Sequence, residues 1–184
     1  MEQKLILSLY EAHHLLRHDV NNRLQVILGY LQLKRPEKAQ EYLMETIKML
    51  QRFSCLSKLR LPMLEAFLLA FDASVGGHNN AFSIQIESAP KKVWANYDSE
   101  LAGFFMDILM PLEKLMINQK IFCSVSFDQT GEQKFQINFQ SEKGILSEIR
   151  EKITNTAGVY NNLHTQLHES ADQELVLLIY LQTS

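Results

Sequence analysis

The strongest constraint on the fold of this chain is the apolar periodicity of residues 3–60, which is interrupted only once. Apolar residues recur there at intervals of three and four, the spacing of one face of an α-helix. The interruption is the Lys-Arg-Pro sequence at residues 34–36, and proline is favoured in the first turn of a helix. The pattern therefore predicts two long helices, over residues 3–33 and about 37–60, which pack antiparallel because their connection is so short.

The second helix has more apolar surface than one neighbour can cover. Met49, Phe53 and Leu56 lie beside the line formed by residues 43, 47 and 50. Two helices of this length cannot bury such broad faces against each other alone. We therefore expect two copies of the hairpin to form a four-helix bundle, which makes the protein a homodimer.

The sequence after Pro62 mixes helical and strand patterns. We first expect a helix over 63–75, ended by Gly76 and Gly77, and then a strand over 81–88. A second helix is expected over 99–117, with an interruption at Pro111, followed by a β-hairpin over 121–139 whose turn lies at 129–132. The last predicted elements are a helix over about 145–155 and a buried strand over 174–182. Residues 161–170 give no clear prediction. The predicted class is α+β, with a helical-hairpin domain over residues 1–60 and a small α/β sandwich domain over 61–184.

The composition excludes several classes of protein. The net charge of −3 provides no basic field for nucleic acid, and no apolar run reaches the roughly 18 residues of a transmembrane helix. Glu11, His13 and His14 interrupt the N-terminal apolar pattern, so we expect no secretory leader. Cys55 and Cys123 lie far apart and form no CxxC pair. We expect a soluble cytoplasmic protein with reduced cysteines, no nucleic-acid partner and no membrane association.

The polar face of the first predicted helix carries the candidate chemistry. At about 100° per residue, one set of residues lies opposite His18 and forms an apolar stripe: Val20, Leu24, Ile27 and Leu31. His18 therefore projects away from the predicted packing face. The residues that share its face, within about 40°, are Glu11, His14, Asn22, Gln25 and Gly29.

The surroundings of His18 suit an imidazole that exchanges a group with a partner. Such an imidazole must be reachable, neutral on the attacking nitrogen and fixed in orientation, and the amide of Asn22 could provide the last condition. Arg17 could contact the anionic oxygens of a phosphoryl group. Asp19 could orient the ring, or it could merely form an ion pair with Arg23 four residues further on.

Two simpler explanations remain open for this histidine. A single surface histidine is most often only solvated. His14 and His18 have the i, i+4 spacing of two zinc ligands on one helix, and His164 and His168 repeat that spacing. However, the chain has no HExxH sequence and no third ligand is fixed, so we expect no bound metal and no cofactor of the protein's own.

The segment from Arg17 to Gln25, RHDVNNRLQ, resembles the phosphoaccepting-histidine motif of the sporulation initiation phosphotransferase B family and of related citrate/fumarate-type sensor kinases. That motif runs roughly H-D-aromatic-x-N-K/R-L. The matching residues are His18, Asp19, Asn22, Arg23 and Leu24. Val20 departs from the motif, where an aromatic residue is usual, but position 20 is expected to face the bundle.

This resemblance implies a phosphotransferase of a phosphorelay, in sporulation initiation, that does not hydrolyse ATP itself. The family takes a phosphoryl group from an aspartate on one response-regulator receiver, a single-domain donor. It then passes the group through the histidine, here His18, to the receiver of a transcription factor. The implied contacts to the phosphoryl group and receivers are Arg17, Asp19, Asn22, Gln25 and His14. Magnesium would be supplied by the receiver.

The second domain separates this chain from the related kinases. A sensor kinase needs glycine-rich D-x-G-x-G segments that let backbone amides approach the phosphates of ATP. Here Gly144 and Gly158 stand alone. The resemblance therefore implies a degenerate histidine-kinase ATP-binding domain that no longer binds nucleotide. Two alternatives stay open: a fragment of a degenerate sensor kinase, and a non-catalytic dimeric adaptor that binds a receiver.

Overall fold

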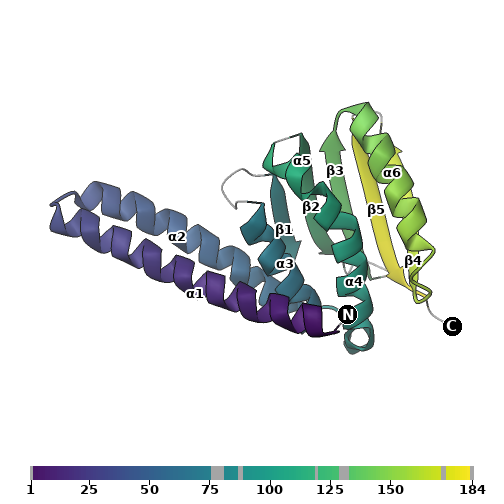
Figure 1. Cartoon of the computed structure of the whole chain (residues 1–184), viewed down its shortest axis with the longest axis horizontal. Coiled ribbons are helices and arrows are strands. Elements are labelled where there is room, and N and C mark those ends of the chain that lie inside the picture. The colour runs from purple at the N-terminus through teal and green to yellow at the C-terminus, as the bar shows by residue number, and fades with distance from the viewer. Residues whose placement is uncertain are drawn as a thin grey trace.

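The computed structural model describes residues 2–75, 81–86, 89–118, 120–128, 133–170 and 173–182, without the side chains of residues 2–16 and 52–53. Two long helices form an arm that projects from a body built of a sheet and shorter helices (Figure 1). The predicted α+β class is confirmed. Within the described residues, no helix is both long enough and apolar enough to span a membrane.

The arm is the predicted helical hairpin. Helix α1 spans Glu2–Gln32 and helix α2 spans Pro36–Leu56, and the two run antiparallel (Figure 1). At the tip, the backbone N–H of Arg35 donates to the carbonyl of Tyr30 at 2.9 Å, and Lys34 adopts a left-handed conformation with φ of 57°. These features end α1 in the manner of a helix C-cap. Pro36 begins α2, as its preference for the first turn predicts.

A cluster of polar and aromatic side chains joins the two helices. The guanidinium of Arg23 on α1 lies over the ring of Tyr42 on α2, 5.5 Å from its centroid, and Tyr30 meets Tyr42 edge to face at 6.3 Å. Arg23 is buried. No ion pair between Asp19 and Arg23 is found among the described side chains, and Arg23 is directed toward α2 instead. This arrangement fixes which side of α1 faces its neighbour and which side faces outward.

The body contains one five-stranded sheet in the order β1-β2-β3-β5-β4. Its strands are β1 (Phe82–Ile86), β2 (Ile121–Asp128), β3 (Lys134–Ser141), β4 (Leu163–Ser170) and β5 (Glu174–Leu181). β1 is parallel to β2, and all other neighbouring strands are antiparallel. Alternate residues of β2, β3 and β5 are buried, so one face of the sheet carries the core.

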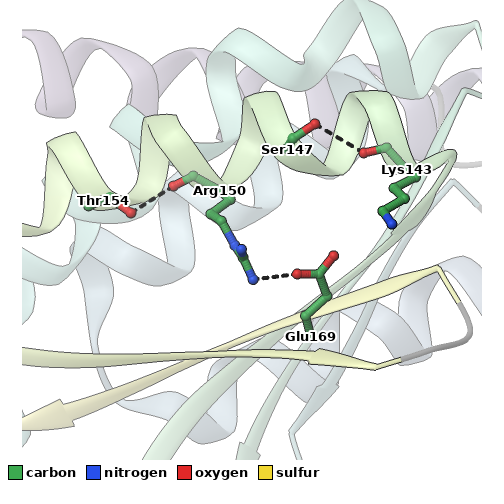
Figure 2. Close-up of polar contacts among 5 residues, drawn as sticks. All are labelled: Lys143, Ser147, Arg150, Thr154 and Glu169. Atoms are coloured by element: carbon green, nitrogen blue, oxygen red, sulfur yellow. Dashed lines mark hydrogen bonds and ion pairs between the residues drawn. The ribbon is translucent and has the colours of Figure 1, made fainter.

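Three helices supply the other side of that core: α3 (Pro62–Ser74), α4 (Asp98–Leu109) and α6 (Lys143–Ala157). Buried Leu146, Ile149 and Ile153 attach α6 to the core. An exposed ion pair between Arg150 on α6 and Glu169 on the edge strand β4 adds a contact between helix and sheet (Figure 2). Along α6, the hydroxyls of Ser147 and Thr154 donate to backbone carbonyls three and four residues earlier in the helix. The covered face is therefore a two-layer sandwich of helices on a sheet.

The sequence predicted most of these elements, with some differences at their ends. The helix expected over 99–117 is interrupted around Pro111, as predicted, and consists of α4, a 3-10 turn η3 (Met110–Leu112) and α5 (Glu113–Ile117). The region left without a prediction, 161–170, contains β4. The 3-10 segments η1 (Ser57–Leu59) and η2 (Lys92–Tyr97) were not predicted. Gly76, Gly77 and the predicted turn at 129–132 lie outside the described residues.

Contacts between distant parts of the sequence hold the body together and join the arm to it. The carboxylate of Asp98, the first residue of α4, accepts the backbone N–H groups of Met63 and Leu64 at 2.8 and 2.9 Å, at the start of α3. The thiol of Cys55 on α2 donates to the carbonyl of Ile86 at 3.0 Å and accepts its N–H at 3.2 Å. The core continues through residues 56, 59 and 61. The division into domains at residue 60 stays a prediction.

Candidate functional site

His18 lies near the middle of α1 and is exposed to solvent. It is sixteen residues from the start of the helix, which corresponds to roughly 24 Å along the axis. Arg23 lies about 140° around the helix from His18. Since Arg23 is buried against α2, His18 is on the outward side of the arm. Its neighbours Arg17 and Asp19 are exposed as well.

One side chain orients the imidazole of His18. The amide nitrogen Nδ2 of Asn22 lies 3.1 Å from Nδ1 of His18, within hydrogen-bonding distance. The two residues are one helical turn apart, so the helix itself places the amide beside the ring. A half-turn of the amide about its Cβ–Cγ bond presents Oδ1 to Nδ1 instead. In that orientation Nδ1–H donates to Asn22 and the lone pair of Nε2 faces solvent.

The other residues singled out from the sequence have no hydrogen bond to the ring among the described side chains. Gln25 is exposed on the same face, about two turns along α1, and Arg17 and Asp19 flank the histidine on either side. They are placed where an incoming group could meet them. The side chains of His14 and Glu11 lie outside the described residues. Among the described side chains, the structure therefore places Asn22 in contact with His18, whereas Arg17, Asp19 and Gln25 lie near the ring without contacting it.

His164 and His168 cannot serve as a pair of zinc ligands. His164 and His168 lie on strand β4, both exposed, with their side chains on the same face of the sheet. In a strand, residues four apart are separated by about 13 Å, so the two imidazoles cannot share one ion. Within the described residues, no three His, Cys, Asp or Glu side chains gather where a metal could bind.

The body has an open groove between α4 and α6, of about 860 Å³. It is lined by Met106, Asp107, Met110, Pro111, Glu148, Glu151, Lys152, Asn155, Thr156 and Val159. The lining carries three carboxylates and one lysine, and this net negative charge disfavours the binding of an anion such as a nucleoside triphosphate. The hydroxyl of Tyr160 donates to Asp107 at 2.6 Å and ties the segment after α6 to α4. Burial, followed by the hydrogen bond to Asp107, raises the pKa of Tyr160.

The arm also exposes an apolar surface that sequence reasoning found only in part. Five of the residues that the sequence places on the packing stripes of the two helices are exposed in the single chain: Leu24, Leu31, Leu43, Ile47 and Leu50. Leu28 and Met44 are exposed as well and extend this apolar surface. Leu28 could have been identified because it is one turn from Leu24, although it lies between the two faces drawn from the sequence. The apolar residues lie on both helices of the arm, away from the polar face of His18.

The comparisons with known proteins agree with this description of the arm. Residues 1–59 match the family described as the alpha-helical domain of SpoOB-type sensor kinases. The match supports, over these residues, the family resemblance expected from the motif around His18.

Other comparisons add little. Among solved structures, the chain is similar to the Acinetobacter baumannii histidine kinase AdeS, with 9% sequence identity and a TM-score of 0.42. The likeness covers 90% of this chain and 98% of that one, and at these values it carries no argument. A search of curated proteins finds no match.

Proposed function

We propose that the protein is a dimeric histidine phosphotransferase of a two-component phosphorelay. It takes a phosphoryl group from an aspartate on one response-regulator receiver, holds it on His18, and passes it to an aspartate on a second receiver. The observation that carries this proposal is the exposed imidazole of His18 with the amide of Asn22 beside its Nδ1, within a segment that matches the SpoOB-type helical domain. A merely solvated histidine needs no such partner.

The chemistry follows from the orientation of the ring. With the proton on Nδ1 and Asn22 as its acceptor, the lone pair of Nε2 attacks the phosphorus atom of the acyl phosphate. The N–P bond forms as the bond to the aspartate oxygen breaks, and the electron pair leaves with the carboxylate. The second transfer reverses these steps on another receiver. The barrier is lowered chiefly by in-line positioning and by neutralisation of the equatorial oxygens, a role that Arg17 can share.

The dimer is supported by the apolar surface of the arm. Leu24, Leu28 and Leu31 are 52%, 54% and 52% exposed, and they have the i, i+4, i+7 spacing of a packing stripe. Leu43, Ile47 and Leu50 repeat this spacing on α2. A second hairpin packed on both stripes would remove them from water as the core of a four-helix bundle. Each copy then presents one His18 on an outer side.

The remaining parts of the proposal concern partners and setting. The magnesium ion is held by the receiver, and the protein needs no cofactor of its own. The body binds no ATP, in keeping with the negative lining of the groove between α4 and α6. The partners are a single-domain donor and a transcription-factor acceptor in the cytoplasm, and the relay is that of sporulation initiation.

The test uses receiver domains labelled with radioactive phosphate on their aspartate. Each is mixed with the wild-type protein, with His18→Gln and with the control His168→Gln, which removes an exposed histidine from β4. We expect acid-labile, base-stable label on the wild type and on the control but not on His18→Gln. Receiver binding without label would favour the adaptor alternative, and label taken up in a parallel incubation with radioactive ATP alone would favour the degenerate kinase. Either result would refute the phosphotransferase.

A further inference from the structure

The groove between α4 and α6 has no part in the proposed transfer at His18. Its apolar lining comes from the end of α4, with Met106, Met110 and Pro111, and from Val159 just after α6. Met110 is 46% exposed and Val159 is 70% exposed, although most apolar side chains of the body lie in its core. Apolar groups that gather in a groove while exposed to water are typical of a binding surface.

The segment that carries Val159 is held firmly against α4. The hydroxyl of Tyr160 donates to the carboxylate of Asp107. Asn162 donates to the carboxylate of Glu100 twice, from its backbone N–H at 3.2 Å and from its side-chain amide at 2.9 Å. These contacts lie on the C-terminal side of Val159, and α6 lies on its N-terminal side. The wall of the groove is therefore already ordered, which lowers the entropic cost of binding an occupant.

The charge of the lining favours a cation. Asp107, Glu148 and Glu151 carry negative charge in the groove, against one positive charge on Lys152. Glu148 and Glu151 are exposed, so a partner can reach them. Helix α6 also has no basic residue in its last turn, and the carbonyl groups at its C-terminal end add a partial negative charge close to Val159.

The shape of the groove favours a helix. The residues of α6 that line it recur at intervals of three and four, and they cover about 16 Å of the helix, or three turns: Glu148, Glu151, Lys152, Asn155, Thr156 and Val159. Both walls are helices, whose backbone groups are already hydrogen-bonded, so an extended peptide would find no ladder of partners there. A helical occupant satisfies its own backbone. Methionine side chains such as those of Met106 and Met110 adapt to the apolar face of such a helix.

We infer that the groove between α4 and α6 is a docking site for a basic amphipathic helix of a partner protein. The apolar face of that helix contacts Met106, Met110 and Val159, and its lysine or arginine side chains meet the three carboxylates of the lining. The inference does not depend on phosphotransfer at His18, because the residues that line the groove all belong to the body and none to the arm.

The experiment measures the binding of three fluorescein-labelled synthetic peptides to the full-length protein by fluorescence anisotropy. The first peptide is an amphipathic helix of leucine and lysine, about 15 residues long, or four turns. The second has the same composition in a scrambled order, and the third has glutamate in place of every lysine. The wild type is compared with Glu148→Lys/Glu151→Lys and with the matched control Glu41→Lys/Glu45→Lys, which makes the same charge change at exposed positions of α2.

We expect the amphipathic basic peptide to bind the wild type about tenfold more tightly than either of the other peptides, because only this peptide matches both the charge and the apolar lining. Glu148→Lys/Glu151→Lys should weaken its binding by about tenfold, since two attractions become repulsions. The control should bind as the wild type does. Val159→Gln should weaken binding by about threefold through lost apolar contact. Because Val159 is so exposed, this variant should keep the melting temperature of the wild type.

Three results would overturn the inference. Equal binding of the amphipathic and scrambled peptides would show a non-specific attraction between charges. Unchanged affinity in Val159→Gln and in Glu148→Lys/Glu151→Lys would place the peptide elsewhere, and Val159→Gln decides alone if the charge reversal lowers the melting temperature. Conversion of Glu148→Lys/Glu151→Lys to a monomer in light scattering would assign the groove to the second copy. Absence of transfer at His18 would refute the proposed function and leave these binding results unaffected.

Discussion

Asp98 is the residue whose replacement should destabilise the body most clearly. Asp98 is 7% exposed, and its carboxylate accepts the N–H groups of Met63 and Leu64, two of the donors that the start of α3 cannot satisfy within the helix. Its negative charge also lies at the positive end of the α3 dipole. Because α3 packs against α1, this contact also supports the base of the arm.

The magnitude can be worked out from these contacts. In Asp98→Ala two largely buried donors lose their partner, at about 1–3 kcal/mol each, partly offset where water reaches Met63. The charge–dipole interaction contributes up to about 1 kcal/mol more. We therefore expect Asp98→Ala to lower the free energy of unfolding by about 2–4 kcal/mol. Asp98→Asn keeps one oxygen acceptor and should lose about half as much.

The assay is urea denaturation followed by the fluorescence of Trp94. It is the only tryptophan of the chain, and it is buried edge-on against Phe127 and Phe135. The midpoint should fall by about 1–2 M urea at constant slope. The control is Glu148→Ala, which removes an exposed carboxylate from α6. A midpoint for Asp98→Ala within about 0.2 M of the control would refute the capping role, on the same conversion.

Two further predictions concern the arm. Ile47→Glu places a charge in the apolar stripe of α2, so it should turn the dimer into a monomer in sedimentation measurements; an intact dimer would show that the stripe lies outside the interface. Asn22→Ala removes the group that orients His18, so transfer to the protein should slow by about 10–100-fold with an unchanged circular dichroism spectrum. A transfer rate equal to that of the wild type would contradict the orienting role, and rescue by Asn22→Gln would support it.

The arm was predictable from sequence because its signals are local. The helical period, the Lys-Arg-Pro break and the position of Pro36 all lie within a few residues of the features that they determine. The same periodicity placed His18 on the outward side. It also placed Asn22 one turn away, where the structure brings its amide to the ring. A side chain's face on a helix follows from residue number alone.

Other features were not predictable because they join distant segments. Asp98 caps a helix that begins 36 residues earlier, and the thiol of Cys55 forms a hydrogen bond with the backbone of Ile86, 31 residues away in the sequence. No short sequence pattern predicts either contact. Strand β4 escaped prediction because it is an edge strand in which polar residues outnumber apolar ones. The spacing of His164 and His168 also resembled a helical pair of ligands.

The central claim is that the phosphoryl group passes through His18, and a two-receiver time course tests it most directly. A labelled donor receiver is mixed with the protein and an unlabelled acceptor receiver, and samples are resolved over time for the wild type and for His18→Gln. We predict that label leaves the donor, appears transiently on the wild-type protein and then accumulates on the acceptor, with no transfer in His18→Gln. Acceptor labelling that persists in His18→Gln, or a donor that keeps its label in the presence of the wild type, would contradict the claim.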